Sequence, residues 1–201
     1  EMAMMCGRLD IDVWEVIDAA ATKPFGFMPF YPGPGLGGHC IPVDPHYLTW
    51  KARAEGFEAR LIELAGQINA QKPAYIVERI ADALNERETA LKSAQLVVLG
   101  VAYKRDIDDV RESPALYVME ILAEKGATVR FVDPMVSTVR IADEDVHAVA
   151  LSKELLREAD AVVLLTDHSA FDYPDIAATA SLVIDTRNAF KGMTTDNIIR
   201  V

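Results

Sequence analysis

The sequence lacks the features that mark several broad classes of protein. Its longest apolar runs, such as residues 161–165, are far shorter than a bilayer-spanning helix, so we expect no membrane partner. Two cysteines are too few for a disulfide framework, and no signal-peptide pattern is seen, which favours a cytoplasmic location. Basic residues are scarce, with 20 Lys+Arg against 31 Asp+Glu and a net charge of −11, which argues against a nucleic-acid partner.

What is present is the composition of a folded chain, with 201 residues of which 51% are hydrophobic and 25% charged. The pattern changes near residue 92, so we predict a helical domain over 1–92 and an α/β domain over 93–201. In the second domain, apolar strands at 95–101, 128–132, 161–165 and 182–185 alternate with helices at 113–125 and 152–158. This alternation is typical of a Rossmann-like parallel sheet with helices on both faces.

The first domain shows helical periodicity. An amphipathic helix at the N-terminus begins in mid-pattern without an initiating Met, so we expect the natural protein to extend upstream. Asp12 and Glu15 begin a second helix, and Pro24 ends it. Residues 58–88 carry two apolar stripes at helical spacing, which fit either the spine of a homodimer or two core helices of a monomer. The stripes are Leu61, Leu64, Ala65 and Ile68, then Tyr75, Ile76, Ile80, Ala83 and Leu84.

Residues 25–44 are rich in glycine and proline and cannot form a regular helix or a central strand. Linkers of this kind are usually polar, whereas this one carries Phe25, Phe27, Phe30, Met28 and Leu36. We therefore expect a packed loop of fixed shape. We also expect Asp44 to cap the following helix, with Pro45 at its first position.

Cys40 is the candidate nucleophile of this loop. Two glycines precede the His39-Cys40 pair, which lets a substrate approach the backbone, and a thiol close to a helix N-terminus gains thiolate character. A structural cysteine remains an alternative, as does a metal site made by His39, Cys40, Asp44 and His46. A cysteine hydrolase needs a remote base, because we expect His39 to point away from the thiol. Cys6, on an apolar helical face, fits a buried and inert position.

Further candidates lie at the carboxyl ends of the predicted strands, where parallel sheets bind ligands. No predicted strand is followed by the Gly-x-Gly-x-x-Gly fingerprint of a dinucleotide site. Instead, the loop after the first strand brings Lys104, Arg105 and Arg111 ahead of a helix that begins at Ser113. This arrangement fits a phosphate site, but equally a salt-bridged surface loop, since four acidic residues lie beside the cations. Arg187 follows the last predicted strand and could reach a phosphate. His168 is interpreted as an ordinary loop histidine.

Three motifs resemble the UDP-glucose/GDP-mannose dehydrogenase family. The run PGPGLGGHCIPVDP at 32–45 is similar to the catalytic cysteine loop of that family. GVAYK at 100–104 with DDVRESP at 108–114, and DTRN at 185–188, resemble its C-terminal signatures. The resemblance covers essentially the whole chain.

The resemblance implies an NAD-dependent oxidation of the C6 alcohol of a UDP-sugar to the acid, through a thiohemiacetal and a thioester on Cys40. It assigns Asp44 to acid–base chemistry and Arg187 to a position near the cofactor. It also implies a substrate site formed by Tyr31, Gly33, Gly35, Leu36, Gly37, Gly38, Tyr103, Lys104 and Arg111, and no metal.

The resemblance also implies what the chain does not contain. The NAD-binding domain of the family is missing, as are a lysine and an asparagine of its central helix, and a family arginine has Lys23 as its nearest counterpart. We therefore expect the chain alone to be inactive.

KPFGF at 23–27 and the cysteine loop are most similar to bacterial UDP-N-acetylhexosamine 6-dehydrogenases of polysaccharide biosynthesis. UDP-N-acetylglucosamine is the first choice of substrate, with UDP-N-acetylmannosamine and UDP-glucose open. The alternative is a non-catalytic module for UDP-sugar binding and dimerisation.

Overall fold

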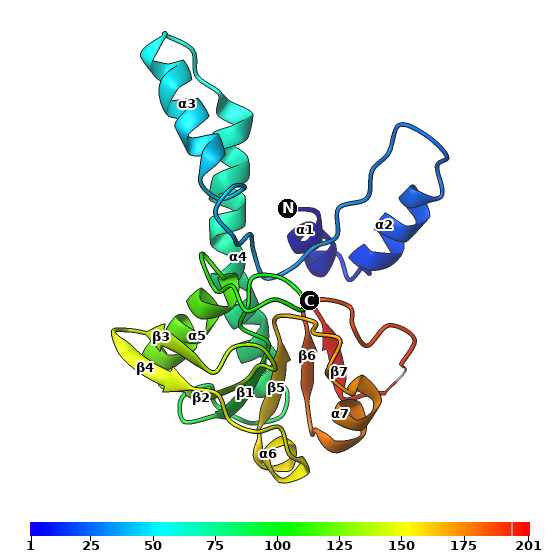
Figure 1. Cartoon of the computed structure of the whole chain (residues 1–201). Coiled ribbons are helices and arrows are strands. Elements are labelled where there is room, and N and C mark those ends of the chain that lie inside the picture. Colours follow the sequence, from blue (N-terminus) through cyan, green and yellow to red (C-terminus); the bar gives the residue numbers. More distant parts are fainter. Residues whose placement is uncertain (194) are drawn as a thin grey trace.

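A computed structural model of the chain describes residues 1–193 and 195–201. Four helices come first and a sheet with its covering helices follows, so that α3 and α4 project from the sheet as an arm (Figure 1). The helices are α1 (Met2–Arg8), α2 (Val13–Ala21), α3 (Asp44–Ala54), α4 (Arg60–Asn85), α5 (Pro114–Glu124), α6 (Lys153–Glu158) and α7 (Tyr173–Thr179). The strands are β1 (Gln95–Leu99), β2 (Thr128–Val132), β3 (Thr138–Ile141), β4 (Glu144–His147), β5 (Ala161–Leu164), β6 (Val183–Asp185) and β7 (Ile198–Arg200).

The main sheet has the strand order β2-β1-β5-β6-β7, and every neighbouring pair is parallel. The chain therefore moves outward from β1 to β2 on one side and from β5 to β7 on the other. Such a reversal opens a crevice outside the carboxyl ends of the two central strands, here β1 and β5. The predicted α/β sheet is confirmed, and its crevice lies beside the loops at 100–113 and 165–168.

Helices cover both faces of this sheet because its strands are apolar on both sides. Leu96 and Val98 of β1 share a core with buried residues of α4 and α5. Val97 and Leu99, which point the other way, share a second core with α6 and α7. Ser113 and Ser152 cap α5 and α6 through their hydroxyl groups, as the sequence predicted for the start of both helices. The hairpin β3–β4, helix α7 and strand β7 were not predicted.

Helix α4 answers the question left open by its two apolar stripes. It is one helix of 26 residues that continues through Pro73. The second stripe is buried against the sheet, with Ile76 and Ile80 wholly inaccessible, whereas Leu61 and Leu64 of the first stripe are 83% and 49% exposed. The first stripe is therefore not part of the core of this chain, which contradicts the reading of two core helices in a monomer.

Other predictions for the helical part have mixed outcomes. Asp12 caps α2, accepting from the backbone N–H of Trp14, and Cys6 is buried, as predicted. Asp44 does not cap α3: Val43 occupies that position, and the Asp44 carboxylate makes no capping bond. The aromatic side chains of residues 25–31 are exposed, so the prediction of a packed loop is wrong for this stretch. None of the helices described is long and apolar enough to cross a membrane.

Candidate functional site

The glycine-rich loop crosses from α2 to α3 over the carboxyl edge of the sheet (Figure 1). At the edge of the sheet its glycines pack against larger side chains, in space that a Cβ atom would otherwise fill. A Cβ on Gly33 would stand 2.6 Å from Nη1 of Arg187, and one on Gly35 would stand 2.9 Å from Cβ of Pro114. The predicted substrate loop is thus held against the ends of β1 and β6, and side chains at these positions would push it away.

The tightest contact is made by Gly37 and Gly38 on Tyr103. A Cβ on Gly37 would be 2.4 Å from the Tyr103 Cβ, and Gly38 has a left-handed φ of +81° beside the same ring. The Gly38 N–H donates to the backbone oxygen of Arg111 at 2.9 Å. These contacts join the predicted cysteine loop to the predicted phosphate loop.

Cys40 and Asp44 open onto a groove of about 1220 Å³ between α3, α4 and α5. Gly35 and Leu36 line the same groove, and so does Glu112. The backbone oxygen of Cys40 accepts from the Asp44 N–H at 2.8 Å, which fixes the separation of the two residues at the start of α3. The candidate thiol and carboxylate therefore share one open space, with both side chains exposed.

His39 contradicts the expectation that it points away from the thiol. Its Nδ1 lies 3.4 Å from the Sγ of Cys40. The left-handed Gly38 and the turn that follows, in which Val43 and Asp44 donate to the Cys40 oxygen, bend the chain so that adjacent side chains meet. Sequence spacing alone does not reveal this turn.

Two predictions were made for the loop after β1, a phosphate site and a salt-bridged surface loop, and each agrees in part with the structure. Arg111 pairs with Asp109, and this bond is the main reason that the Asp109 pKa falls to about 2. Arg105 pairs with Asp167. Lys104 is exposed and makes no hydrogen bond or ion pair with any residue that the structure describes. Two of the three cations are therefore salt-bridged, and Lys104 stays available for an anion.

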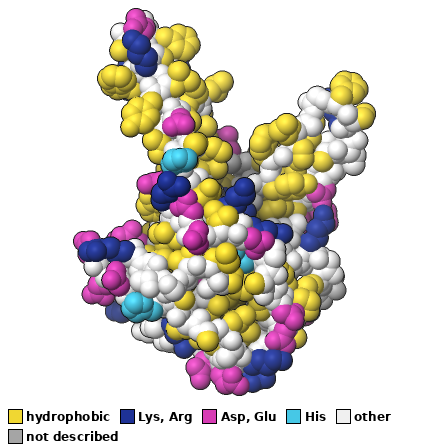
Figure 2. Space-filling model, viewed as in Figure 1, with side chains coloured by type: hydrophobic (Ala, Val, Ile, Leu, Met, Phe, Trp, Pro, Cys, Tyr) yellow, Lys and Arg dark blue, Asp and Glu magenta, His cyan; other side chains and the backbone are white. Residues whose placement is uncertain are grey.

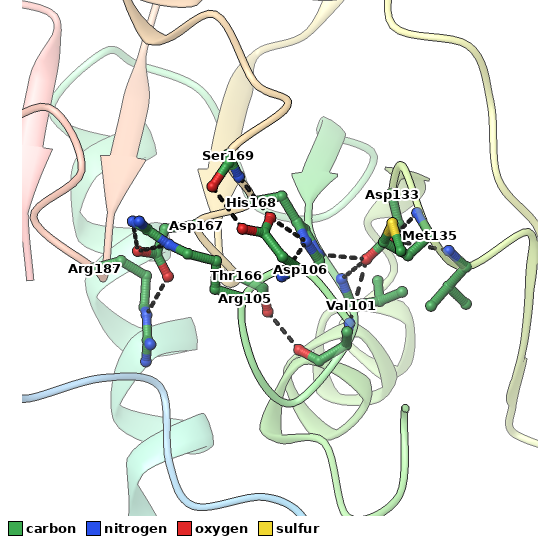
Figure 3. Close-up of polar contacts among 12 residues, drawn as sticks. Val101, Arg105, Asp106, Asp133, Met135, Thr166, Asp167, His168, Ser169 and Arg187 are labelled. Carbon is green, nitrogen blue, oxygen red and sulfur yellow. Dashed lines mark hydrogen bonds and ion pairs between the residues drawn. The ribbon is translucent and has the colours of Figure 1, made fainter. Parts of the chain in front are cut away.

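Asp167 links the ends of three adjacent strands (Figure 3). One carboxylate oxygen binds Arg105 from the loop after β1, and the other accepts from Nε of Arg187, after β6, at 3.2 Å. The terminal nitrogens of Arg187 have no hydrogen bond within the described part of the chain and face Gly33. The sequence did not single out Asp167, because a carboxylate at a strand end is common in any α/β protein.

Beneath these loops lies a buried polar network (Figure 3). Asp133 accepts hydrogen bonds from Nε2 of His168 and from the backbone N–H groups of Val101, Ala102, Met135 and Val136. Burial alone would raise the pKa of Asp133, but these bonds hold it below its ordinary value. Nδ1 of His168 accepts from the N–H of Asp106 at 3.0 Å. His168 lies in the loop after β5, as predicted, but it is wholly buried and both of its ring nitrogens are hydrogen-bonded.

Tyr31 is tied to the helical part. Its hydroxyl donates to Asp18 at 3.0 Å, its ring stacks on Trp14, and Asp18 also pairs with Lys191. Over residues 1–193 and 195–201, no three His, Cys, Asp or Glu side chains gather as a metal site would require, so the four ligand types of the cysteine loop do not converge.

Family models identify both parts of the chain. The central domain of the UDP-glucose/GDP-mannose dehydrogenase family matches residues 1–71, and its UDP binding domain matches residues 97–192. The chain belongs to this family. Its match to the UDP-glucose/GDP-mannose dehydrogenases makes it part of a family of nucleotide-sugar oxidoreductases.

Curated relatives agree with this family. NDP-N-acetyl-D-galactosaminuronic acid dehydrogenase of Ralstonia nicotianae is 36% identical over 93% of this chain and 43% of that protein. UDP-N-acetyl-D-mannosamine dehydrogenase of Escherichia coli is 34% identical over 85% of the chain and 41% of the relative. A solved UDP-D-ManNAc dehydrogenase from Pyrococcus horikoshii superimposes with a TM-score of 0.83 at 31% identity, over 99% of this chain and 46% of that structure. The chain spans less than half the length of these relatives.

Proposed function

We propose that the protein is a UDP-sugar 6-dehydrogenase, with Cys40 as its nucleophile and residues 1–92 and 93–201 as its central and UDP-sugar-binding domains. The observation that carries the proposal is the docking of the cysteine loop on the carboxyl edge of the sheet. This docking brings Cys40 and Asp44 into one groove with Glu112, and it joins the cysteine loop to Arg111 through the Gly38 N–H. A thiol, a carboxylate and a cationic loop are the groups that oxidation of a nucleotide sugar to its acid requires.

In this mechanism the thiolate of Cys40 adds to the C6 aldehyde of the sugar and forms a thiohemiacetal. Its oxidation gives a thioester, which water then hydrolyses. Asp44 is free of a capping bond, so its carboxylate can orient that water and accept its proton. The backbone N–H groups of the glycine-rich loop can stabilise the oxyanion.

The hydride acceptor is proposed to be NAD, which when bound would supply the two-electron oxidant for both oxidations. In this chain we assign only Arg187 to it, through terminal nitrogens that lie beside Gly33 and bond to none of the residues described. No Gly-x-Gly-x-x-Gly run follows a strand that the structure describes, so we infer that the cofactor is bound mainly by a region that the relatives have and that this chain does not match. On this proposal, the 201-residue chain does not turn over alone.

The UDP moiety is assigned to the loop after β1. Within residues 1–193 and 195–201, Lys104 has an unpaired ammonium group and Nη1 of Arg111 has no bond, while Asp109 orients the Arg111 guanidinium. Tyr103 lies beneath Gly37 and Gly38 and so shapes the floor of the same site. Helix α5 begins directly after this loop and adds the positive end of its dipole.

For the hexose we propose a UDP-N-acetylhexosamine. The amino-acid sequence of the cysteine loop favours UDP-N-acetylglucosamine, whereas several similar proteins are named UDP-N-acetyl-D-mannosamine dehydrogenases. UDP-glucose remains in the test panel. The binding experiment must therefore decide the configuration at C2 of the hexose.

A homodimer through the arm of α3 and α4 completes the proposal. Apolar side chains gather over this arm (Figure 2). Tyr47, Leu48 and Trp50 of α3 are 60–69% exposed, and they extend the exposed stripe of α4. An apolar patch of this kind is typical of a surface that another protein covers.

Isothermal titration of the chain with UDP and the three UDP-hexoses tests the binding site. We expect Lys104→Ala to weaken binding by about tenfold or more, the scale of one charge-assisted hydrogen bond. Lys125→Ala is the matched control, since it removes an exposed lysine at the far end of α5. Equal affinity in both variants would refute the assignment of Lys104.

A turnover assay separates the proposed enzyme from a non-catalytic module. We expect the natural gene product to reduce NAD with a UDP-N-acetylhexosamine, and the variant Cys40→Ala to lose that activity. Binding of UDP-sugar without any turnover by the natural gene product would instead support the module.

A further inference from the structure

The contact between the side chains of His39 and Cys40 is not one of the contacts that hold the cysteine loop on the sheet. The loop is anchored by the Gly38 N–H on the Arg111 oxygen and by the packing of glycines on Tyr103. The His39 side chain is exposed, and its only hydrogen-bond contact in the described part of the chain is the one to Sγ, at 3.4 Å. A histidine beside a nucleophilic sulfur is the arrangement that general-base activation of a thiol requires.

The charges around this pair support the same chemistry. The pKa of Asp109 is lowered first by its hydrogen bond from Arg111, and the charge of His39 adds to the effect. The pKa of Arg111 is raised first by Asp109, and the negative charge of Cys40 also contributes. His39, Cys40, Asp109 and Arg111 therefore interact as one cluster.

Asp109 and Arg111 both belong to the loop after β1, on which the cysteine loop docks. The other titratable groups that face the pair come from the loop after β1 and from the groove wall. They are Tyr103, Glu112, Asp44 and His46.

We propose that His39 is a catalytic residue that takes the proton of the Cys40 thiol and returns it to the sugar oxygen. This inference rests on the proposed function. In the first half of the step, the S–H bond breaks and an N–H bond forms at Nδ1. In the second half, the sulfur lone pair forms a C–S bond with the aldehyde carbon, the carbonyl π electrons move to oxygen, and that oxygen takes the proton from Nδ1. No electron is gained or lost in the step.

The test uses alkylation of Cys40 by iodoacetamide, followed by mass spectrometry between pH 5 and pH 10. Only the thiolate reacts, so the rate reports how much of the thiol is ionised. Buried Cys6 serves as an internal reference in every sample. The variants are His39→Asn and, as a matched control, His147→Asn, which changes another exposed histidine on β4.

We expect His39→Asn to slow alkylation at pH 7 by about tenfold and to move its half-maximal rate upward by about one pH unit. His147→Asn should follow the wild-type profile. A loss of fold would appear in the circular dichroism spectrum and in labelling of Cys6, and His39→Gln then serves as the second variant. Superimposable pH profiles for wild type and a folded His39 variant would overturn the inference.

The outcomes also separate this inference from the proposed function. If Cys40→Ser in the natural gene product leaves turnover intact while His39→Asn shifts the alkylation profile, the nucleophile is wrong and the pairing stands. If Cys40→Ser abolishes turnover and the alkylation profile does not shift, the function stands and His39 is not the base.

Discussion

Lys72 provides the sharpest test of the forces that hold the helical part to the sheet part. It lies on α4 and is only 6% exposed, and its ammonium group is a buried donor without a hydrogen-bond partner in the described part of the chain. The Tyr75 ring, 4.5 Å away, offers a cation–π contact. Replacing Lys72 by methionine keeps the length of the side chain and removes the charge, so we expect a more stable protein.

The magnitude follows from the pKa of Lys72, which burial lowers from 10.5 to about 8. Each pKa unit corresponds to about 1.4 kcal/mol, so burying the charged form costs about 3 kcal/mol. The lost cation–π contact takes back about 1 kcal/mol. We therefore expect Lys72→Met to raise the free energy of unfolding by about 2 kcal/mol at pH 7.

The dependence on pH supplies a second check. Below pH 8 the amine is charged in both the folded and the unfolded chain, so its full cost is present. Between pH 8 and 10.5 the unfolded chain binds the proton and the folded one does not, so wild-type stability rises with pH. The advantage of Lys72→Met should shrink across this window.

Urea denaturation followed by circular dichroism, at pH 7 and at pH 9.5, measures both effects. The control Lys125→Met removes one exposed positive charge, and it should change stability by less than about 0.5 kcal/mol. A Lys72→Met protein that is less stable than wild type at pH 7 would refute the reasoning.

Three further substitutions test the sheet edge. Gly100→Ala should destabilise by about 3 kcal/mol in thermal unfolding, because its φ is +79° and a Cβ would stand 2.3 Å from the Thr166 oxygen; an unchanged melting temperature would contradict this. Asp133→Asn should cost about 3 kcal/mol at pH 7, because the carboxylate accepts five hydrogen bonds. Since the Asp133 pKa is lowered, that loss should fade as pH drops below about 4, and a loss independent of pH would argue against it. Asp167→Asn should release Arg187 and speed proteolysis within residues 25–44 severalfold, whereas unchanged cleavage would show that the glycine contacts alone hold the loop.

The sheet was predictable because its strands are short apolar runs separated by helices with clear caps. The predicted strand at 128–132 matches β2, and Ser113 and Ser152 cap the helices that they were expected to start. The hairpin β3–β4 was missed because its strands have only four residues each: Val139 and Ile141 alternate with polar residues in β3, but the run is too short to detect, and β4 carries Val146 as its one apolar residue.

The site was predictable in outline and not in its contacts. Glycines at 33, 35, 37 and 38 indicated close approach, but only the fold reveals that Arg187, Pro114 and Tyr103 are what approaches. The neighbours His39 and Cys40 meet because of one turn, and Asp133 and His168 meet across 35 residues. Neither geometry is encoded in local periodicity.

Pro73 removes a backbone hydrogen bond from α4 at a point beside the groove. Proline has no N–H, so the Asn69 carbonyl one turn earlier loses the donor that an unbroken helix would supply. That carbonyl oxygen lies 3.9 Å from the position of a Cβ on Gly35, at the groove. The turn of α4 at Asn69–Pro73, which lacks this hydrogen bond, thus lies beside the glycine-rich loop that packs on the sheet. A bend of α4 at this turn would move α3 relative to α5 and would change the width of the groove that both helices line, while the docked glycines keep their place on the sheet.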